Sequence, residues 1–287
     1  MGGTIYQAVM QRAAHLPLLQ SYLNGTISQS DFCQQLDLSR PQLKTLGLSD
    51  WWIDLLARFP SDVWHGARRL ADALREYGIT TSANAVAPGD GAVDPTGFAA
   101  FEQLVSASFS HLPDRYTSIF PEESRSAYTL SCAIRPTTIF VAGSYYGYLA
   151  VWLLPGLAPD GQIVCSDVDP LVCDLARRNF TALGENDRVN VICEDAERLL
   201  KQDSRPIDLF VLDAYGSHQG PDPRYHGKAI YGPLLQAALP RLHENSLLLV
   251  HNAERDSADL AEFFQVLGQA RLSLELKTTD NLAVYQR

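Results

Sequence analysis

The sequence predicts an α/β fold: a mostly parallel sheet with helices on both faces, preceded by an all-helical N-terminal domain. From Thr137 onward, short apolar runs alternate with helical stretches, which is the pattern of successive βαβ units. The first apolar run leads into a glycine turn, and the second ends on an acid, Asp167. Residues up to about 83 instead carry apolar side chains at helical spacing. We therefore expect a helical capping or dimerisation domain over residues 1–115 and the sheet domain over residues 116–287.

The N-terminal helices are predicted from apolar spacing together with Ser, Pro and Gly at their ends. Ser28, Ser49 and Ser61 each precede a helical stretch as an N-cap, and Pro41 stands near the first turn of another. The expected helices cover residues 6–23, 28–36, 41 onward, 50–59, 61–77, 97–111 and 121–134. The segment 84–95 is rich in Gly, Pro and Asp, so we expect an exposed linker or lid there.

The apolar runs of the second half predict five strands and the helices between them. The strands are expected within residues 137–143, 163–167, 188–196, 207–215 and 246–252. Two of the intervening helices are expected over residues 171–183 and 196–201.

Composition excludes several classes of protein. The 287 residues are 46% hydrophobic, which rules out a disordered chain, and the formal net charge of −10 argues against binding nucleic acid or an anionic membrane. The five cysteines lack CxxC spacing, which disfavours zinc and indicates free thiols in a reducing compartment. The N-terminus lacks a signal-peptide pattern, and the apolar stretches are too short or interrupted to span a bilayer. We expect a cytoplasmic protein.

One N-terminal segment, residues 27–43, has the apolar rhythm and tight turn of a helix-turn-helix. A DNA reader needs a basic face, yet residues 1–130 hold nine Lys and Arg against thirteen Asp and Glu. The segment is therefore better explained as part of a unit that covers a pocket or forms a homodimer.

The glycine turn and the acid after the second strand predict a nucleoside-cofactor pocket. Gly143 and Gly147 keep the turn free of Cβ atoms, and Asp167 can accept hydrogen bonds from both ribose hydroxyls. The turn is Gly-x-x-x-Gly and holds two bulky rings, Tyr145 and Tyr146, which would crowd the pyrophosphate of NAD. An aromatic face suits a sulfonium cation instead. These features favour S-adenosylmethionine, with at least one of the two tyrosines in contact with it.

From Thr137 to its end, about half of the chain resembles the class I S-adenosylmethionine-dependent methyltransferases, most closely the small O-methyltransferases of the catechol and caffeoyl-CoA type. Those enzymes carry an acidic-x-Gly-x-x-x-Gly-Tyr turn, and this chain has Gly-Ser-Tyr-Tyr-Gly-Tyr over residues 143–148. The resemblance implies a Rossmann-like sheet that binds S-adenosylmethionine. The cofactor-binding residues it implies are Gly143, Ser144, Tyr145, Tyr146, Gly147, Asp167, Val168, Asp195, Ala196 and Asp213.

Two acids near this predicted pocket have a structural alternative. Asp169 is expected to cap the following helix rather than touch the ribose, and Asp195 can meet the adenine amino group, cap its own helix, or do both. Ligands of open α/β sheets bind at the carboxyl ends of the strands, where polar residues after buried runs are costly unless used. The candidate site residues at the ends of the fourth and fifth strands are Asp213, Tyr215, His251 and Asn252.

The chain departs from the family pattern at three places. The acid expected two residues before Gly143 is Val141. The metal-dependent members hold a divalent cation with an Asp, an Asp and an Asn, and here His251 stands between Asp213 and Asn252. Mg²⁺ prefers oxygen ligands, so no metal site is expected. The lysine that serves as base in the catechol enzymes is replaced by residues 214–216, Ala-Tyr-Gly.

The predicted reaction is metal-independent transfer of a methyl group from S-adenosylmethionine to an oxygen or nitrogen of a small molecule. His251 is either a general base or a histidine hydrogen-bonded at a strand end, and Asp213 and Tyr215 complete the predicted catalytic set. The polar loop 216–228 is expected to close over substrate, with His218, Tyr225 and His226 as weaker contact candidates.

Two rival functions stay open at this point. The altered turn, together with the run Asp-Val-Asp-Pro over residues 167–170, is similar to enzymes such as nicotianamine synthase. Those enzymes use the aminocarboxypropyl arm of the cofactor and release methylthioadenosine. A catalytically inactive cofactor-binding regulator is the third candidate. The sequence does not name the acceptor.

Overall fold

The computed structural model describes residues 17–18, 21, 29–45, 50, 53, 64–79, 93–110, 119, 121–252, 257–270, 272, 274–277 and 282–286. The chain divides into two compact units. The smaller unit comprises residues 1–65 and 111–120, and the larger comprises residues 66–110 and 121–287. The helices expected over residues 6–23 and 50–59 and the linker over residues 84–92 lie essentially outside the described residues.

The smaller unit contains the pair of helices predicted from the helix-turn-helix-like segment. Helix α3 covers Gln29–Leu38 and α4 covers Arg40–Thr45. Each helix buries one leucine, Leu36 and Leu43. Arg40 and Lys44 both form ion pairs with Asp50, so both basic side chains are matched to a carboxylate. A homodimer through these helices stays a prediction.

The larger unit is built on a seven-stranded sheet with the order β3-β2-β1-β4-β5-β7-β6. The first five strands of that order are parallel, and β7 is antiparallel to both β5 and β6. The strands are β1 (Thr138–Ala142), β2 (Gln162–Asp167), β3 (Val189–Cys193), β4 (Ile207–Leu212), β5 (Leu242–His251), β6 (Leu274–Lys277) and β7 (Leu282–Gln286). The prediction of a mostly parallel Rossmann-like sheet is confirmed.

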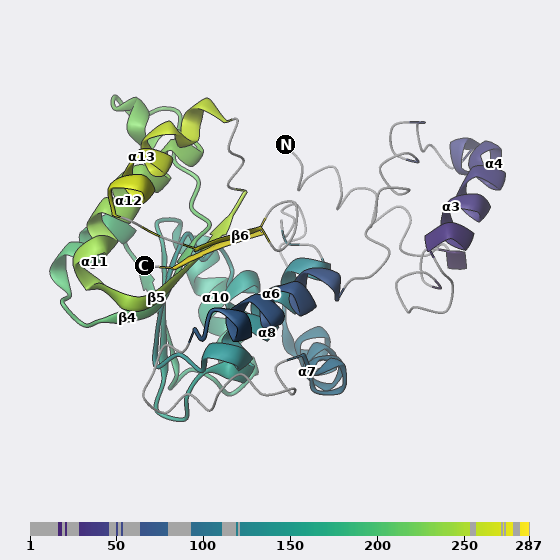
Figure 1. The fold of residues 1–287 in the computed structure, drawn as a ribbon, viewed down its shortest axis with the longest axis horizontal. Helices are drawn as coiled ribbons and strands as arrows, with labels where there is room; N and C mark the ends of the chain where they lie inside the picture. The colour runs from purple at the N-terminus through teal and green to yellow at the C-terminus, as the bar shows by residue number, and fades with distance from the viewer. Residues whose placement is uncertain are drawn as a thin grey trace. The chain divides into compact units, whose positions relative to one another are not determined.

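Helices cover both faces of the sheet because its strands are apolar on both sides. Side chains alternate along each strand, so Phe140, Phe210 and Leu248 share one face and form a continuous apolar core. That face is covered by α11 (Ala196–Gln202), α12 (Tyr231–Ala238) and α13 (Ala261–Gln269), and Figure 1 shows these three helices together on one side. The elements α6 (His65–Glu76), α7 (Pro95–Ser108), α8 (Pro121–Ile134) and α10 (Pro170–Ala182) lie on the other side.

The shorter elements connect these helices and strands. They are the α-helical turn α9 (Tyr148–Val151) and the 3₁₀ turns η1 (Leu154–Gly156), η2 (Pro223–Tyr225), η3 (Lys228–Ile230), η4 (Leu239–Arg241) and η5 (Ala258–Leu260).

The division into units differs from the boundary expected between residues 115 and 116, because α6 and α7 fall with the sheet. The reason is aromatic packing. The Phe98 ring of α7 stacks on Trp152 with ring centroids 5.1 Å apart, and Phe109 packs edge-on against Tyr148 at 5.7 Å. Both phenylalanines are buried, and these contacts remove their apolar surface from water.

Among the described residues, no helix has both the length and the apolar character needed to cross a membrane.

Candidate functional site

The glycine turn after β1 lies against the backbone at the end of β4. Gly143 has φ +80°, and a Cβ placed on it would lie 2.3 Å from the Cα atom of Ala214. The amides of Gly143 and Ser144 both donate to the carbonyl of Ser166, at 3.0 Å each. The turn is therefore held between β2 and β4, and only glycine fits at its first position.

Asp167 at the end of β2 is fixed by the same turn. Its Oδ2 accepts a hydrogen bond from the Tyr145 amide at 2.8 Å, and its Oδ1 accepts one from the Asp169 amide at 3.1 Å. Tyr145 has a φ of +50°, an uncommon value outside glycine, and this conformation directs its amide at the carboxylate. Each carboxylate oxygen keeps a lone pair for a further donor. The predicted pairing of acid and glycine turn thus exists in space.

The two tyrosines of the turn have different surroundings. Tyr146 is fully buried beside Phe109 and Tyr148, and its carbonyl accepts from the Asn179 side chain at 3.2 Å. Tyr145 is half-buried, and its ring lies 4.7 Å from that of Tyr146. Of the pair, Tyr145 has the more accessible ring. The second glycine, Gly147, has φ +90° and no room for a Cβ against the ring of Phe180.

The remaining predicted cofactor residues surround the ends of β2 and β3. Val168 is 69% exposed directly after Asp167. Asp195 caps α11 by accepting from the Arg198 amide at 2.9 Å, and Ala196 is the first residue of that helix. Asp169 caps α10 through the Leu171 amide at 2.9 Å, which confirms the capping interpretation. Asp195 is likewise a cap, and its contact with adenine stays a prediction.

A buried polar network joins the ends of β4 and β5. Asp213 Oδ1 accepts from His251 Nδ1 at 2.8 Å and from Lys228 Nζ at 3.2 Å. Lys228 also donates to the Tyr231 hydroxyl at 2.6 Å, and that hydroxyl donates to the carbonyl of His251 at 2.7 Å. On the other side of the imidazole, Nε2 lies 3.5 Å from Glu123 Oε2 in α8. His251 and Glu123 are both fully buried.

The charges in this network determine its protonation. Burial acts to lower the pKa of His251, but the carboxylates of Asp213 and Glu123 outweigh it and raise that pKa to about 10. Burial acts to raise the pKa of Asp213, and the His251 and Lys228 cations lower it overall. His251 is therefore an imidazolium at neutral pH. Of the two roles predicted for it, this geometry favours the hydrogen-bonded histidine at a strand end over the general base.

The donors around Asp213 compete with a divalent metal ion for its carboxylate. His251 Nδ1 and Lys228 Nζ both form hydrogen bonds with Asp213 Oδ1. Within the described part of the chain, no group of three His, Cys, Asp or Glu is arranged to hold a metal ion. Asn252, the other family position, follows β5 with φ +56°.

Sequence reasoning missed Lys228, Tyr231 and Glu123. It sought a lysine directly after Asp213, whereas the lysine in the network stands fifteen residues later. The signal lay in the two glycines of the intervening loop: Gly216 and Gly227 pair in an antiparallel bridge, with N···O distances of 2.9 and 3.0 Å. This pairing closes the loop and brings the residue after Gly227 back beside Asp213.

The other loop candidates are exposed, as Tyr215 and His218 are, or half-buried, as Tyr225 and His226 are. Tyr215 is 69% exposed, and its hydroxyl lies 3.0 Å from His218 Nε2. His226 Nε2 lies 2.7 Å from the carbonyl of Gly220, and the Tyr225 hydroxyl donates to Glu197 at 2.7 Å. Of the predicted catalytic set, Asp213 and His251 are joined directly by a hydrogen bond. The third member, Tyr215, is paired with His218.

Comparison with known proteins matches residues 140–253 to a model described as a methyltransferase domain. A catechol O-methyltransferase of Mycobacterium tuberculosis is 28% identical over 112 residues, which cover 39% of this chain and 50% of that protein. A catechol O-methyltransferase of Niastella koreensis is 22% identical over 149 residues, covering 50% of this chain and 62% of that protein. The chain thus aligns with about half to three-fifths of the length of these relatives.

Among solved structures, an O-methyltransferase from Bacillus cereus in complex with SAH aligns with a TM-score of 0.49 and 17% identity. The alignment covers 75% of this chain and 97% of that chain. The family match, over residues 140–253, and the two relatives confirm the predicted resemblance to the class I methyltransferases.

Proposed function

We propose that this chain transfers the methyl group of S-adenosylmethionine to an oxygen or nitrogen of a small molecule without a divalent metal ion. The observation that carries the proposal is Asp167, whose carboxylate is hydrogen-bonded to the amide of Tyr145 within the glycine turn. This geometry supports the proposed ribose contact, because the carboxylate lies beside a turn that only glycine can make. The names of the two curated relatives favour an oxygen acceptor.

When bound, S-adenosylmethionine supplies an electrophilic methyl group on a sulfonium. The protein's task is then to align the acceptor and to take its proton. Lys228 is our candidate base. Burial lowers its pKa, although Asp213 acts in the opposite direction, so its neutral amine forms at a lower pH than that of a solvated lysine. Asp213 and the Tyr231 hydroxyl hold the lysine nitrogen in place.

The charges around Asp213 support the proposal of metal independence. The metal-dependent members of the family that this chain resembles hold a divalent cation with the residues at these positions. Here the His251 imidazolium donates to Asp213 Oδ1 and supplies positive charge at that carboxylate. His251 is fully buried and Lys228 retains slight exposure, so of these two groups the lysine amine is the one that an acceptor can reach.

The test is incubation with S-adenosylmethionine and catechol as the probe acceptor, with and without EDTA, followed by mass analysis of the products. We expect S-adenosylhomocysteine and methylated catechol at a rate that EDTA does not change. Lys228→Ala is expected to lower the rate at least tenfold, because the loss of a positioned base costs about 10²–10⁴. Lys44→Ala, a change at an exposed lysine of the smaller unit, is the matched control.

Two outcomes would contradict the proposal. Methylthioadenosine as the nucleoside product would support transfer or cyclisation of the aminocarboxypropyl arm instead. Loss of activity in EDTA that Mg²⁺ restores would refute metal independence.

A further inference from the structure

The loop between Asp213 and Lys228 has a fixed base. Gly216 and Gly227 exchange both backbone hydrogen bonds of an antiparallel pair. A Cβ placed on Gly216 would lie 1.7 Å from the carbonyl oxygen of Tyr225, so the two backbones are in direct contact. Any displacement of Tyr225 therefore disturbs the paired glycines from which Lys228 extends.

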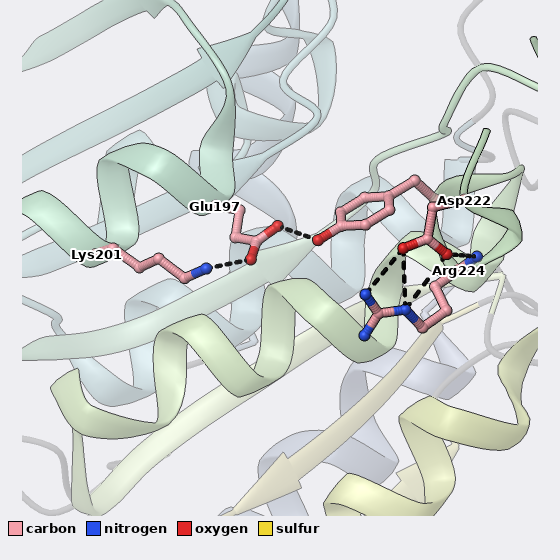
Figure 2. Close-up of polar contacts among 5 residues, drawn as sticks. Glu197, Lys201, Asp222 and Arg224 are labelled. Carbon is pink, nitrogen blue, oxygen red and sulfur yellow. Dashed lines mark hydrogen bonds and ion pairs between the residues drawn. The ribbon is translucent and has the colours of Figure 1, made fainter. Parts of the chain in front are cut away.

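The Tyr225 side chain ties this loop to helix α11. Its hydroxyl donates to Glu197 Oε2 at 2.7 Å, and the other oxygen of Glu197 pairs with Lys201 one turn along the helix. Figure 2 shows Glu197 on α11 with the ion pair to Lys201 drawn on one side of its carboxylate. The hydrogen bond to Glu197 raises the pKa of Tyr225 to about 12. The hydroxyl thus remains a donor throughout the neutral range.

A second set of contacts gives Tyr225 its backbone geometry. Asp222 accepts from the Arg224 amide at 3.0 Å, which caps the 3₁₀ turn η2, and its carboxylate also pairs with the Arg224 guanidinium at 2.9 Å. Figure 2 shows the contacts between Asp222 and Arg224. The turn is thus ordered locally, and Tyr225 is its one side chain that reaches the helix through a hydrogen bond between described residues.

Only two residues separate Tyr225 from Lys228. One of them, Gly227, has φ +54°, and this conformation turns the chain from the loop into η3. Lys228 then extends to Asp213 and Tyr231. Holding Tyr225 in place therefore also restrains Lys228, because the segment between them is short and is paired at Gly227.

We propose that Tyr225 and Glu197 are positioning residues that hold Lys228 on Asp213. The inference deepens the proposed function and rests on it for the role of Lys228 as the base. Helix α11 begins at Ala196, next to the predicted adenine contact Asp195. One helix thus carries both the predicted adenine contact and the anchor of the lysine loop, so the base is held in a fixed relation to the cofactor pocket.

The test measures how readily Lys228 is acetylated by acetic anhydride in the full-length protein, at several pH values from 6 to 10, by mass spectrometry. Tyr225→Phe and Glu197→Ala both remove the hydrogen bond. We expect each to increase labelling of Lys228 about two- to tenfold relative to the exposed Lys44, the range set by the net contribution of one hydrogen bond. The pH at which labelling is half-maximal should also change in both variants.

Two further variants separate positioning from a general structural effect. In Glu197→Gln the side-chain oxygen can still accept from the tyrosine hydroxyl, so labelling should return to within about twofold of the wild type. Lys201→Ala removes only the outer partner of Glu197, and it should also leave Lys228 labelling unchanged. The proposal would be overturned if Lys228 in the Tyr225→Phe variant were labelled at the wild-type rate. It would also be overturned if Lys201→Ala increased Lys228 labelling as much as Tyr225→Phe does.

The outcome can be separated from that of the proposed function. If the wild type releases methylthioadenosine in place of S-adenosylhomocysteine but the labelling pattern holds, the anchor stands and the assigned reaction fails. If the wild type is active but Lys228 labelling does not respond to Tyr225→Phe or Glu197→Ala, the reaction stands and the anchor is refuted.

Discussion

Replacement of Gly143 by alanine tests whether the glycine turn has the geometry described above. The turn packs against the backbone after β4, and a Cβ on residue 143 would lie 2.3 Å from the Cα of Ala214 and 2.5 Å from its nitrogen. Both are backbone atoms, so no side chain can rotate away. We expect Gly143→Ala to separate the turn from β4 and to displace the amide of Tyr145 from Asp167.

The expected cost has two parts. A left-handed φ costs a residue with a Cβ about 1–2 kcal/mol, and overpacking a close contact costs about 1–3 kcal/mol more. The free energy of unfolding should therefore fall by about 2–5 kcal/mol. For a unit of this size each kcal/mol lowers the melting temperature by about 2–4 °C.

Two other glycines supply matched controls. Gly184 has φ +76°, and a Cβ on it would meet no atom within 4 Å, so Gly184→Ala adds the backbone cost without the overlap. Gly268 lies in α13 with open space around it, so Gly268→Ala should stabilise by about 0.5–1 kcal/mol. The assays are thermal melting and calorimetric titration with S-adenosylhomocysteine. The reasoning is refuted if Gly143→Ala has the same melting temperature as Gly184→Ala and binds S-adenosylhomocysteine with the affinity of the wild type.

Three further predictions concern buried charges and the cofactor carboxylate. The raised pKa of His251 means that the folded state binds its proton more tightly than the unfolded state. This contribution to stability is complete below about pH 6.5 and is lost as pH rises through about 10. Denaturant titrations should show the free energy of unfolding falling over this pH window. An equal fall in a His251→Gln variant would contradict the assignment of this effect to His251. Asp208 accepts from Thr137 and from His243, and despite its burial these hydrogen bonds lower its pKa. Asp208→Asn should cost about 1–3 kcal/mol at pH 7, and the difference should shrink as the carboxylate of the wild type protonates below about pH 4, as acid denaturation curves of both proteins would show. Asp167→Asn should weaken binding of S-adenosylhomocysteine about 10- to 100-fold in calorimetry, since hydrogen bonds to a charged group contribute about 1.5–3 kcal/mol, and unchanged affinity would rule out the ribose role.

The five central strands could be predicted because each is a compact apolar run. All six residues of β4 are buried, and no helix of that length would bury every side chain. The strands β6 and β7 were not predicted. Strand β6 is only four residues long and alternates Leu with charged residues, a pattern too short to separate from a loop.

The candidate site was predictable only where chemistry follows a strand directly. Asp167, Asp213 and His251 were found in this way. Lys228 and Glu123 reach Asp213 and His251 from a loop and a helix elsewhere in the chain. An acid in the first turn of a helix is ordinarily explained by the helix dipole, so nothing local in the sequence of α8 distinguishes Glu123 from its neighbour Glu122. Such pairings depend on tertiary structure.

The charge balance of the network has a consequence for how such a site could change during evolution. Glu123 and Asp213 contribute two negative charges, and His251 and Lys228 contribute two positive charges. Exchanging His251 for an aspartate would restore the family's metal ligand but leave three carboxylates around one ammonium. Removing Lys228 alone would leave two carboxylates around one imidazolium. Each single substitution therefore leaves the buried network with unbalanced charge, and we expect such a site to change through paired substitutions.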